Sequence, residues 1–235
     1  MVPVIYQLSP YDNTFPPIAS AATDPDGLLA IGGDLSPSRL VEAYQSGIFP
    51  WYSDGEPLLW WSPQIRGVLF FEDFYINRSF AKFLRKNPYK LTVNKAFEDV
   101  ISHCSTVPRG RGGDGTWITG EMIFAYIQLH QLGHAHSIEV WQDGELVGGL
   151  YGVIVGGCFC GESMFHLKPN ASKVAYWGLV NWLKRHGGHF IDCQMQNDFL
   201  QTLGVSEMPR ELYLKLLTAA QQVVLPTDMW MTQQI

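Results

Sequence analysis

Residues 136–165 read HSIEVWQDGELVGGLYGVIVGGCFCGESMF, and this stretch carries the clearest β signal in the chain. Three runs of apolar and β-branched residues are separated by the pairs Asp143-Gly144 and Gly156-Gly157. Two-residue turns of this composition join antiparallel strands, because their backbone twist matches that of the strands. The stretch therefore predicts a three-stranded antiparallel meander.

A helix and one further strand follow the meander. Residues 171–187, ASKVAYWGLVNWLKRHG, are helical in pattern, and Asn170 before them is a favourable N-cap. Residues 189–195, HFIDCQM, form a short strand-like run. Upstream of the meander, strand-like and helical patterns alternate: GVLFFEDFYI at 67–76, a basic helix, YKLTV at 89–93, AFEDVISHC at 96–104, and a helix over 119–132. This order predicts a mixed-sheet α+β domain.

The N-terminal part reads as a separate small unit. Ser36 and Pro37 begin a helix that Gly47 ends, and a loop rich in proline and glycine runs from there to Pro63. We predict a small α/β domain over residues 1–64 and the mixed-sheet domain over residues 65–235.

The composition excludes several classes of protein. Hydrophobic residues make up 46% and charged residues 16%, which excludes a disordered tail protein. No apolar run reaches the roughly 20 residues that a membrane-spanning helix needs. The first 17 residues have neither a basic segment nor a continuous apolar core, so they do not resemble an export signal. We expect a cytoplasmic protein.

Cysteines and histidines are candidate metal ligands, but the spacing favours structural roles. Cys158 and Cys160 are two residues apart, whereas zinc sites keep two or more residues between their cysteines. The histidines at 130, 134 and 136 lack the glutamate of a zinc-protease helix. We expect reduced buried thiols, surface or capping histidines, and no metal.

Basic residues are concentrated in one segment, although the formal net charge of −6 argues against a protein that coats nucleic acid by bulk electrostatics. The spacing of Arg78, Lys82, Arg85 and Lys86 predicts one face of a helix, opposite an apolar side. Further basic residues follow at Lys90, Lys95, Arg109 and Arg111. A surface that binds RNA and an ordinary solvated helix face both fit this pattern.

Two tryptophans stand in loops rather than in apolar segments. Trp51 lies in FPWYS and Trp117 in GDGTWIT, where glycine and proline leave little core for a large ring to join. Tryptophan is usually a core residue. A loop tryptophan instead offers a flat face, on which stacking of a base contributes about 1–3 kcal/mol.

Polar side chains occur within the expected strands. Strand periodicity predicts that Cys158, Cys160, Glu162 and Met164 share one face. It predicts the same for Asp192 and Gln194. A carboxylate on a central strand is costly without a partner. Two interpretations of Glu162 and Asp192 therefore remain: a structural pair bonded to backbone or a buried lysine, and a functional pair.

An apolar stripe on the long helix adds a further feature of this region. Tyr176, Leu179 and Leu183 are spaced to lie along one side of the helix 171–187. Core packing is the ordinary interpretation of such a stripe.

Eight segments, in order, resemble the leucyl/phenylalanyl-tRNA–protein transferase family. They are GLLAIGGDLSPSRLVEAYQSGIFPWY (27–52), WWSPQIRGVL (60–69), GTWIT (115–119), LGHAHSIEVW (132–141), ELVGGLYGV (145–153), FCGESMF (159–165), NASK (170–173) and IDCQMQND (191–198). The first twenty residues and the tail after Arg210 match loosely, and the glycine-rich approach to Trp117 is longer than the family's. The layout of meander, helix and strand is also that of the GCN5-related N-acyltransferase superfamily. Its glycine-rich coenzyme A loop is absent, because FHLKPNASK (165–173) stands there.

The resemblance implies an enzyme that transfers leucine or phenylalanine, with methionine as a third donor, from aminoacyl-tRNA to acceptor proteins that begin with Arg or Lys. It implies that the product is marked for degradation by the N-end rule. We expect a monomer without a cofactor, a metal or a membrane partner. A coenzyme A-dependent acyltransferase is disfavoured by the missing loop, and a non-catalytic RNA-binding module by the polar groups at 192 and 194.

The resemblance also implies roles for particular residues. Gln194 and Asp192 would be the catalytic pair, with Asp192 either positioning Gln194 or pairing with the basic side chain of the acceptor. Trp51 and Trp117 would hold the 3′ adenosine of the tRNA. The remaining substrate-binding residues would be Tyr44, Phe159, Glu162, Met164, Ile191 and Asn197, and the tRNA-binding residues Arg78, Lys82, Arg85, Lys86 and Lys90.

Overall fold

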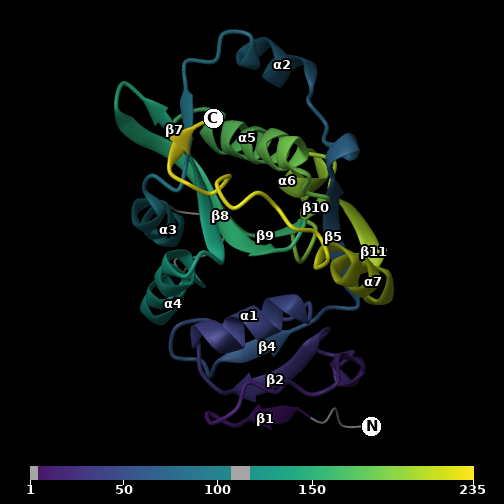
Figure 1. Ribbon diagram of the computed structural model, residues 1–235. Helices are drawn as coiled ribbons and strands as arrows, with labels where there is room; N and C mark the ends of the chain where they lie inside the picture. The colour runs from purple at the N-terminus through teal and green to yellow at the C-terminus, as the bar shows by residue number, and fades with distance from the viewer. Residues whose placement is uncertain (1–4, 107–116) are drawn as a thin grey trace.

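The computed structural model describes residues 5–106 and 117–235, which form two β-sheets (Figure 1). The smaller sheet has the order β1 (Tyr6–Leu8), β2 (Leu28–Gly32), β4 (Leu59–Trp61), β3 (Phe49–Pro50). The short helices η1 (Ile18–Ser20) and α1 (Pro37–Gln45) accompany it. The predicted start and end of α1 are confirmed, with Pro37 in its first turn and Gly47 after it at a φ of +73°.

The larger sheet contains the predicted meander. Its strands, in spatial order, are β11 (Ser206–Pro209), β5 (Ile65–Phe70), β10 (Phe190–Asp192), β9 (Cys158–His166), β8 (Glu145–Val155), β7 (Ala135–Gln142), β6 (Lys90–Val93) and β12 (Gln233–Gln234). All neighbours are antiparallel except β9 and β10. That pair is parallel because a helix, α5, crosses over between them. The mixed-sheet α+β prediction is confirmed.

Helices cover both faces of the larger sheet. Helix α5 (Ala171–His186) packs on β7, β8 and β9, whereas α3 (Phe97–Thr106) and α4 (Gly120–Gln131) belong to the opposite side. The remaining helices are η2 (Phe71–Asp73), α2 (Arg78–Leu84), α6 (Asp198–Gln201) and α7 (Arg210–Ala220). Asn170 precedes α5 as predicted, but its φ is +63° and its side chain makes no capping hydrogen bond.

The predicted domain boundary at residues 64 and 65 lies in the segment between the two sheets. One apolar cluster runs through both units, joining Leu29 and Tyr44 of the N-terminal part to Met122 and Tyr151 of the larger part. The two units therefore share a core, and the division into domains stays a prediction.

A β-bulge at Glu162 overturns the prediction that residues 158, 160, 162 and 164 share a face. Tyr151 pairs with Ser163 and Gly152 with Gly161, so Glu162 is an extra residue on β9. Before the bulge, Cys158 and Cys160 point to the side of α3 and α4, where both are buried. After it, Met164 points to the side of α5. Gly152 permits this close approach, because a Cβ there would lie 2.2 Å from the Cys160 carbonyl oxygen.

The basic helix is shorter than predicted. Helix α2 ends at Leu84, since the chain turns after it to reach β6, so Arg85 is its C-cap and Lys86 lies beyond it. Lys90 is the first residue of β6. Arg109 and Arg111 lie outside the described residues.

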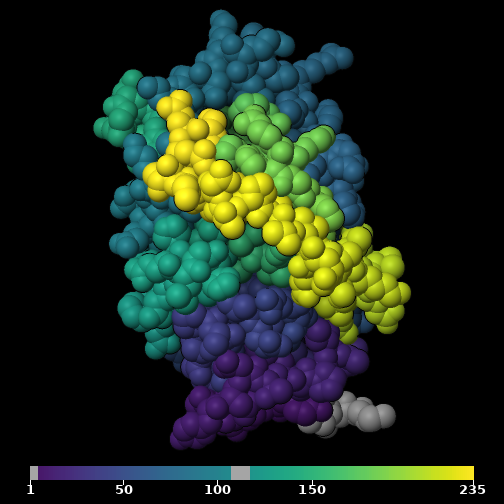
Figure 2. Space-filling model, viewed as in Figure 1, coloured from purple at the N-terminus to yellow at the C-terminus, as the bar shows by residue number. Residues whose placement is uncertain are grey.

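The chain after α7 crosses the molecule as a long strap and ends at the far edge of the larger sheet, where β12 pairs with β6 (Figures 1 and 2). Trp230 of the strap stacks on His136, which is 3% exposed, so the prediction of surface histidines is wrong for this residue. Burial lowers the pKa of His136 to about 3. No helix among residues 5–106 and 117–235 is long and apolar enough to cross a membrane.

Candidate active site

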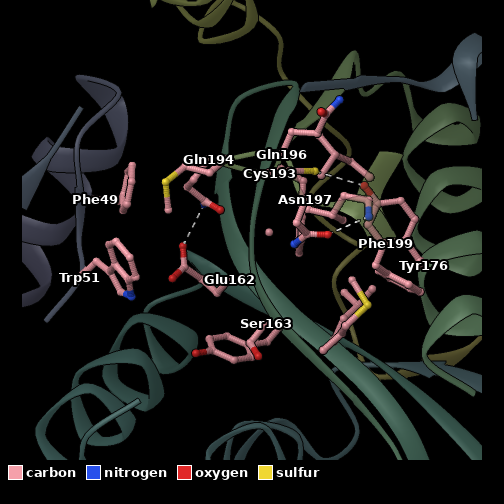
Figure 3. A pocket seen from close by; sticks show the side chains of 18 of the residues that line it. Phe49, Trp51, Glu162, Ser163, Tyr176, Cys193, Gln194, Gln196, Asn197 and Phe199 are labelled. Carbon is pink, nitrogen blue, oxygen red and sulfur yellow. Dashed lines mark hydrogen bonds between the residues drawn. The ribbon is translucent and has the colours of Figure 1, made fainter. Parts of the chain in front are cut away.

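A cavity of about 600 Å³ lies where the two sheets meet. Phe49 and Trp51 line one side of it, and Tyr176 and Phe199 line the opposite side (Figure 3). Glu162 and Gln194 lie between the two sides. The volume is in the range of cavities that hold small molecules and cofactors.

The aromatic side brings together the two loop tryptophans. Both Trp51 and Trp117 line the cavity, and Trp51 is 41% exposed. The rings of Trp51 and Trp61 pack edge to face at a centroid distance of 5.8 Å, and Trp61 Nε1 donates to the Trp51 carbonyl at 2.7 Å. A second tryptophan therefore fixes the loop, while a face of Trp51 stays accessible.

The opposite side of the cavity is apolar. The bulge in β9 and the parallel pairing of Ile191 with Phe159 bring these two residues and Met164 to the same side. Leu179 of α5 completes the wall, so part of the predicted helix stripe lines the cavity. Such a wall accommodates an apolar side chain.

Gln194 is held in an unusual backbone conformation. Strand β10 ends at Asp192, and Gln194 has a φ of +54°, so the prediction that Asp192 and Gln194 share a strand face is wrong. Two hydrogen bonds brace the turn, from Met195 N to the Cys193 carbonyl at 2.7 Å and from Gly67 N to the Gln194 carbonyl at 2.9 Å. Among the described residues, the other non-glycine residues with positive φ are Asn or Asp, which tolerate it better. Strain of this kind is found at functional sites, where the surrounding structure maintains it.

Asp192 is buried away from the cavity. Its carboxylate accepts hydrogen bonds from Arg66 Nε at 2.8 Å, Arg66 Nη2 at 2.6 Å, the Tyr213 hydroxyl at 2.8 Å and Gln194 N at 2.9 Å. It is 0% exposed and does not line the cavity. These four bonds and the burial favour the alternative in which Asp192 positions Gln194 over the one in which it pairs with an acceptor side chain. The backbone or a buried lysine was predicted as the structural partner of such a carboxylate. The partners of Asp192 are instead Arg66 and, from the backbone, Gln194 N.

Arg66 links this carboxylate to the N-terminal unit. Its Nη1 donates to the Gly47 carbonyl at 3.0 Å, and its guanidinium lies over the rings of Phe49 and Tyr213. Burial alone would lower the pKa of Arg66, but the charge and hydrogen bonds of Asp192, together with Tyr213, outweigh it, so the pKa of Arg66 is raised. Arg66 therefore stays charged, and its bonds to Asp192 and to the Gly47 carbonyl fix the end of β10 against the N-terminal unit.

Glu162 is the carboxylate that lines the cavity. It accepts hydrogen bonds from the Tyr44 hydroxyl at 2.6 Å, the Tyr126 hydroxyl at 3.1 Å and Gln194 Nε2 at 3.4 Å. Burial raises the pKa of Glu162 to about 7, although the two tyrosines act in the opposite direction. Tyr44 itself is 1% exposed and lies behind Glu162 rather than in the cavity wall.

Asn197 lines the same cavity beyond Gln194. Its side-chain oxygen caps helix α6 by accepting from Leu200 N at 2.9 Å. The amide group is otherwise exposed toward the cavity rim, where it can donate to a ligand.

The predicted tRNA-binding residues lie apart from the cavity. Helix α2 is at the opposite end of the molecule from the N-terminal sheet (Figure 1). All five side chains are exposed, and within the described part of the chain none of them is in an ion pair with an acidic residue: Arg78, Lys82, Arg85, Lys86 and Lys90. Their charge is therefore available to a polyanion.

Three residues of the site were missed by the sequence analysis: Arg66, Tyr126 and Tyr213. Arg66 did carry a signal, because a charged residue inside the apolar run IRGVLF indicates a buried ion pair. The tyrosines carried none, since an aromatic residue on an amphipathic helix is ordinary core.

Two family models match consecutive parts of this chain. Residues 68–218 match the family model described as leucyl/phenylalanyl-tRNA protein transferase, and residues 33–64 match the model of its N-terminal domain. The chain is 53% identical over 231 residues to a leucyl/phenylalanyl-tRNA–protein transferase of Pseudoalteromonas translucida, covering 98% of this chain and 96% of that protein. It is 55% identical over 216 residues to one of Syntrophotalea carbinolica, covering 92% of each.

A crystal structure of FemX is similar to 72% of this chain, over 68% of its own, at 10% identity and a TM-score of 0.48. The two family models and the full-length relatives identify the sequence independently of that likeness. This chain belongs to the leucyl/phenylalanyl-tRNA protein transferase family.

Proposed function

We propose that this chain transfers leucine or phenylalanine from aminoacyl-tRNA to the α-amine of acceptor proteins that begin with Arg or Lys. The added residue marks the acceptor for degradation by the N-end rule. The observation that carries this proposal is a single cavity with a tryptophan side, an apolar side, and Gln194 and Glu162 between them.

The cavity accounts for the donor. The terminal adenosine stacks on Trp51 and Trp117, which requires no base-specific contact. The aminoacyl side chain lies against Phe159, Met164 and Ile191. Leucine, phenylalanine and methionine are unbranched at Cβ, and we expect leucine to be preferred over valine by about 1–3 kcal/mol, the usual contribution of one methylene.

The reaction needs little chemistry from the protein, because the aminoacyl ester is already activated. The Gln194 Nε2 atom donates to Glu162, which leaves the side-chain oxygen free to accept a hydrogen bond from the attacking amine. Holding ester and amine together supplies up to about 7–11 kcal/mol of the acceleration. Asp192 acts indirectly, by accepting a hydrogen bond that holds the Gln194 backbone in place.

The other partners follow from charge and location. The exposed basic residues on and after α2 attract the tRNA backbone. We place the reaction in the cytoplasm, where aminoacyl-tRNA is made, and we expect a monomer without a metal, a cofactor or a membrane partner.

The decisive experiment uses Leu-tRNA and a set of peptides that differ in their first residue. Peptides beginning with Arg or Lys should gain one leucine by mass, and peptides beginning with Asp or Glu should not. An N-acetylated Arg peptide is the matched control, because it lacks the attacking amine. Equal labelling of acidic and basic N-termini would contradict the proposal.

A further inference from the structure

Glu162, Tyr44 and Tyr126 form a closed ring of hydrogen bonds. The three residues come from β9, α1 and α4, respectively. Tyr44 contacts Glu162 Oε1 at 2.6 Å, Tyr126 contacts Glu162 Oε2 at 3.1 Å, and the two hydroxyl oxygens are within hydrogen-bond distance of each other. Both tyrosines are 1% exposed or less, so water does not supply alternative partners.

The number of protons in this ring depends on whether Glu162 is ionised or protonated. Two tyrosine hydroxyls carry two protons, but the ring has three oxygen–oxygen contacts. If Glu162 is ionised and both tyrosines donate to it, the contact between the hydroxyl oxygens has no proton. If Glu162 carries a proton on Oε2, it donates to Tyr126, Tyr126 donates to Tyr44, and Tyr44 donates to Oε1. The second state has one proton more than the first, and once that proton is gained, rotation of the hydroxyls closes the ring.

We infer that Glu162 takes the proton released by the attacking amine. The inference rests on the proposed function and extends it, because it assigns the proton to a second group beside Gln194. Glu162 lines the cavity, and its Oε1 lies 3.4 Å from Gln194 Nε2, next to the oxygen that orients the amine. The ring receives the proton without movement of a heavy atom.

The surrounding charges agree with this role. Burial raises the pKa of Glu162, the two tyrosines and Arg66 of β5 lower it, and Asp192 of β10 raises it, which brings it to about 7. Burial and the Glu162 charge raise the pKa of Tyr44 and Tyr126 well above the usual value, so both remain donors. A proton acceptor is most effective when its pKa lies near the working pH.

The amine nitrogen attacks the ester carbonyl carbon, a C–N bond forms, and one N–H proton passes to the Glu162 carboxylate. The C–O bond to the ribose then breaks, its electron pair goes to the ribose oxygen, and that oxygen takes a proton from Glu162. The products are a peptide bond, a free hydroxyl on the tRNA and the original carboxylate.

Three variants test the inference. Glu162→Gln is close in shape to the protonated state, because its NH₂ can donate to Tyr126 while its oxygen accepts from Tyr44, so it should fold. Tyr126→Phe removes one donor to the carboxylate. Tyr52→Phe is the matched control, since Tyr52 is also buried and bonds Thr119 outside the ring. Transfer of leucine to an Arg peptide is measured at saturating Leu-tRNA from pH 5.5 to 8.5.

We expect Glu162→Gln to lower turnover about 10²-fold or more, with the Michaelis constant for the peptide within about threefold of the parent. On the acidic side of the pH profile, turnover falls as Glu162 becomes protonated. Tyr126→Phe should move the midpoint of this fall upward by about one pH unit, because it removes a hydrogen bond that favours the charged form of Glu162. Tyr52→Phe should leave this midpoint unchanged. The acceptor amine titrates identically with all variants, so a shift of the midpoint between variants arises from a group of the protein.

A spectroscopic titration provides a readout independent of activity. In protein labelled with ¹³C at the glutamate carboxyl, the resonance absent from Glu162→Gln should titrate near pH 7, and higher in Tyr126→Phe. A midpoint below pH 5 would overturn the inference. So would a Glu162→Gln variant that retains turnover and loses only peptide affinity, because Glu162 would then bind the acceptor side chain. A parent protein that transfers no leucine would instead refute the proposed function, and the inference with it.

Discussion

Replacing Asp192 by Asn separates structural from chemical roles at the centre of the molecule. The substitution removes the negative charge that faces Arg66 Nε and Nη2, and Arg66 is 1% exposed. Removing one partner of a buried ion pair leaves the other charge uncompensated, which typically costs about 3–5 kcal/mol. We expect Asp192→Asn to lower the free energy of unfolding by that amount.

Turnover should respond differently from stability. An asparagine at 192 keeps an oxygen that can accept from Gln194 N, the bond that is 2.9 Å long in the parent. The Gln194 turn should therefore persist, and transfer per folded molecule should fall less than about tenfold. Urea unfolding followed by tryptophan fluorescence measures the first quantity, and single-turnover transfer at low temperature measures the second.

Two further variants serve as controls for this prediction. Asp198→Asn changes an exposed carboxylate at the start of α6 and should alter stability by less than about 0.5 kcal/mol. Arg66→Met combined with Asp192→Leu removes both charges and should regain most of the lost stability. Native stability in Asp192→Asn would refute the ion pair. Native stability with a hundredfold loss of turnover would show that Asp192 meets the substrate.

Four more outcomes are expected. Gln194→Ala should lower turnover about 10²-fold with a nearly unchanged Michaelis constant for tRNA, and Gln194→Glu should retain more activity because its oxygens still accept. Trp51→Ala should show the opposite pattern. Charge reversal at Lys82 and Arg85 should raise the Michaelis constant for tRNA, as added salt should for the parent. Because His136 has a folded pKa of about 3 against an ordinary 6.5, its stabilising contribution is complete above pH 6.5 and is lost as the pH falls, by about 2 kcal/mol at pH 5.

Contrary results are defined for the charge reversal, for Gln194→Ala and for His136. Charge reversal at Lys184 and Arg185, at the end of α5, changes the net charge by the same amount at another place on the surface. An equal loss of tRNA affinity in that variant would exclude a specific role of the α2 region in tRNA binding. Normal transfer by Gln194→Ala at saturating tRNA would exclude its orienting role. For His136, urea unfolding at pH 7 and pH 5 should differ less in His136→Gln than in the parent. The exposed His189→Gln should match the parent, and identical pH dependence in all three would exclude the buried neutral ring.

The features that the sequence determined by itself are those that depend on residues close together in the chain. The meander followed from apolar runs separated by Asp143-Gly144 and Gly156-Gly157, and α5 from its helical pattern. Trp51 and Trp117 were singled out because the glycine and proline around them leave little core for a large ring to join, and both line the cavity. Each of these inferences uses only local backbone preferences and periodicity, which the neighbouring residues specify completely.

The tertiary structure alone decided the partners and directions of the polar side chains. Asp192 is paired with Arg66, 126 positions earlier in the chain, so its role could not be seen in the pattern around it. The bulge at Glu162 reversed the strand alternation because β8 and β9 pair with one extra residue, and the positive φ of Gln194 turned its side chain toward the cavity. Tyr126 became part of the site through α4 packing beside α1. Contacts between distant segments are fixed by packing of the whole chain, and no local preference encodes them.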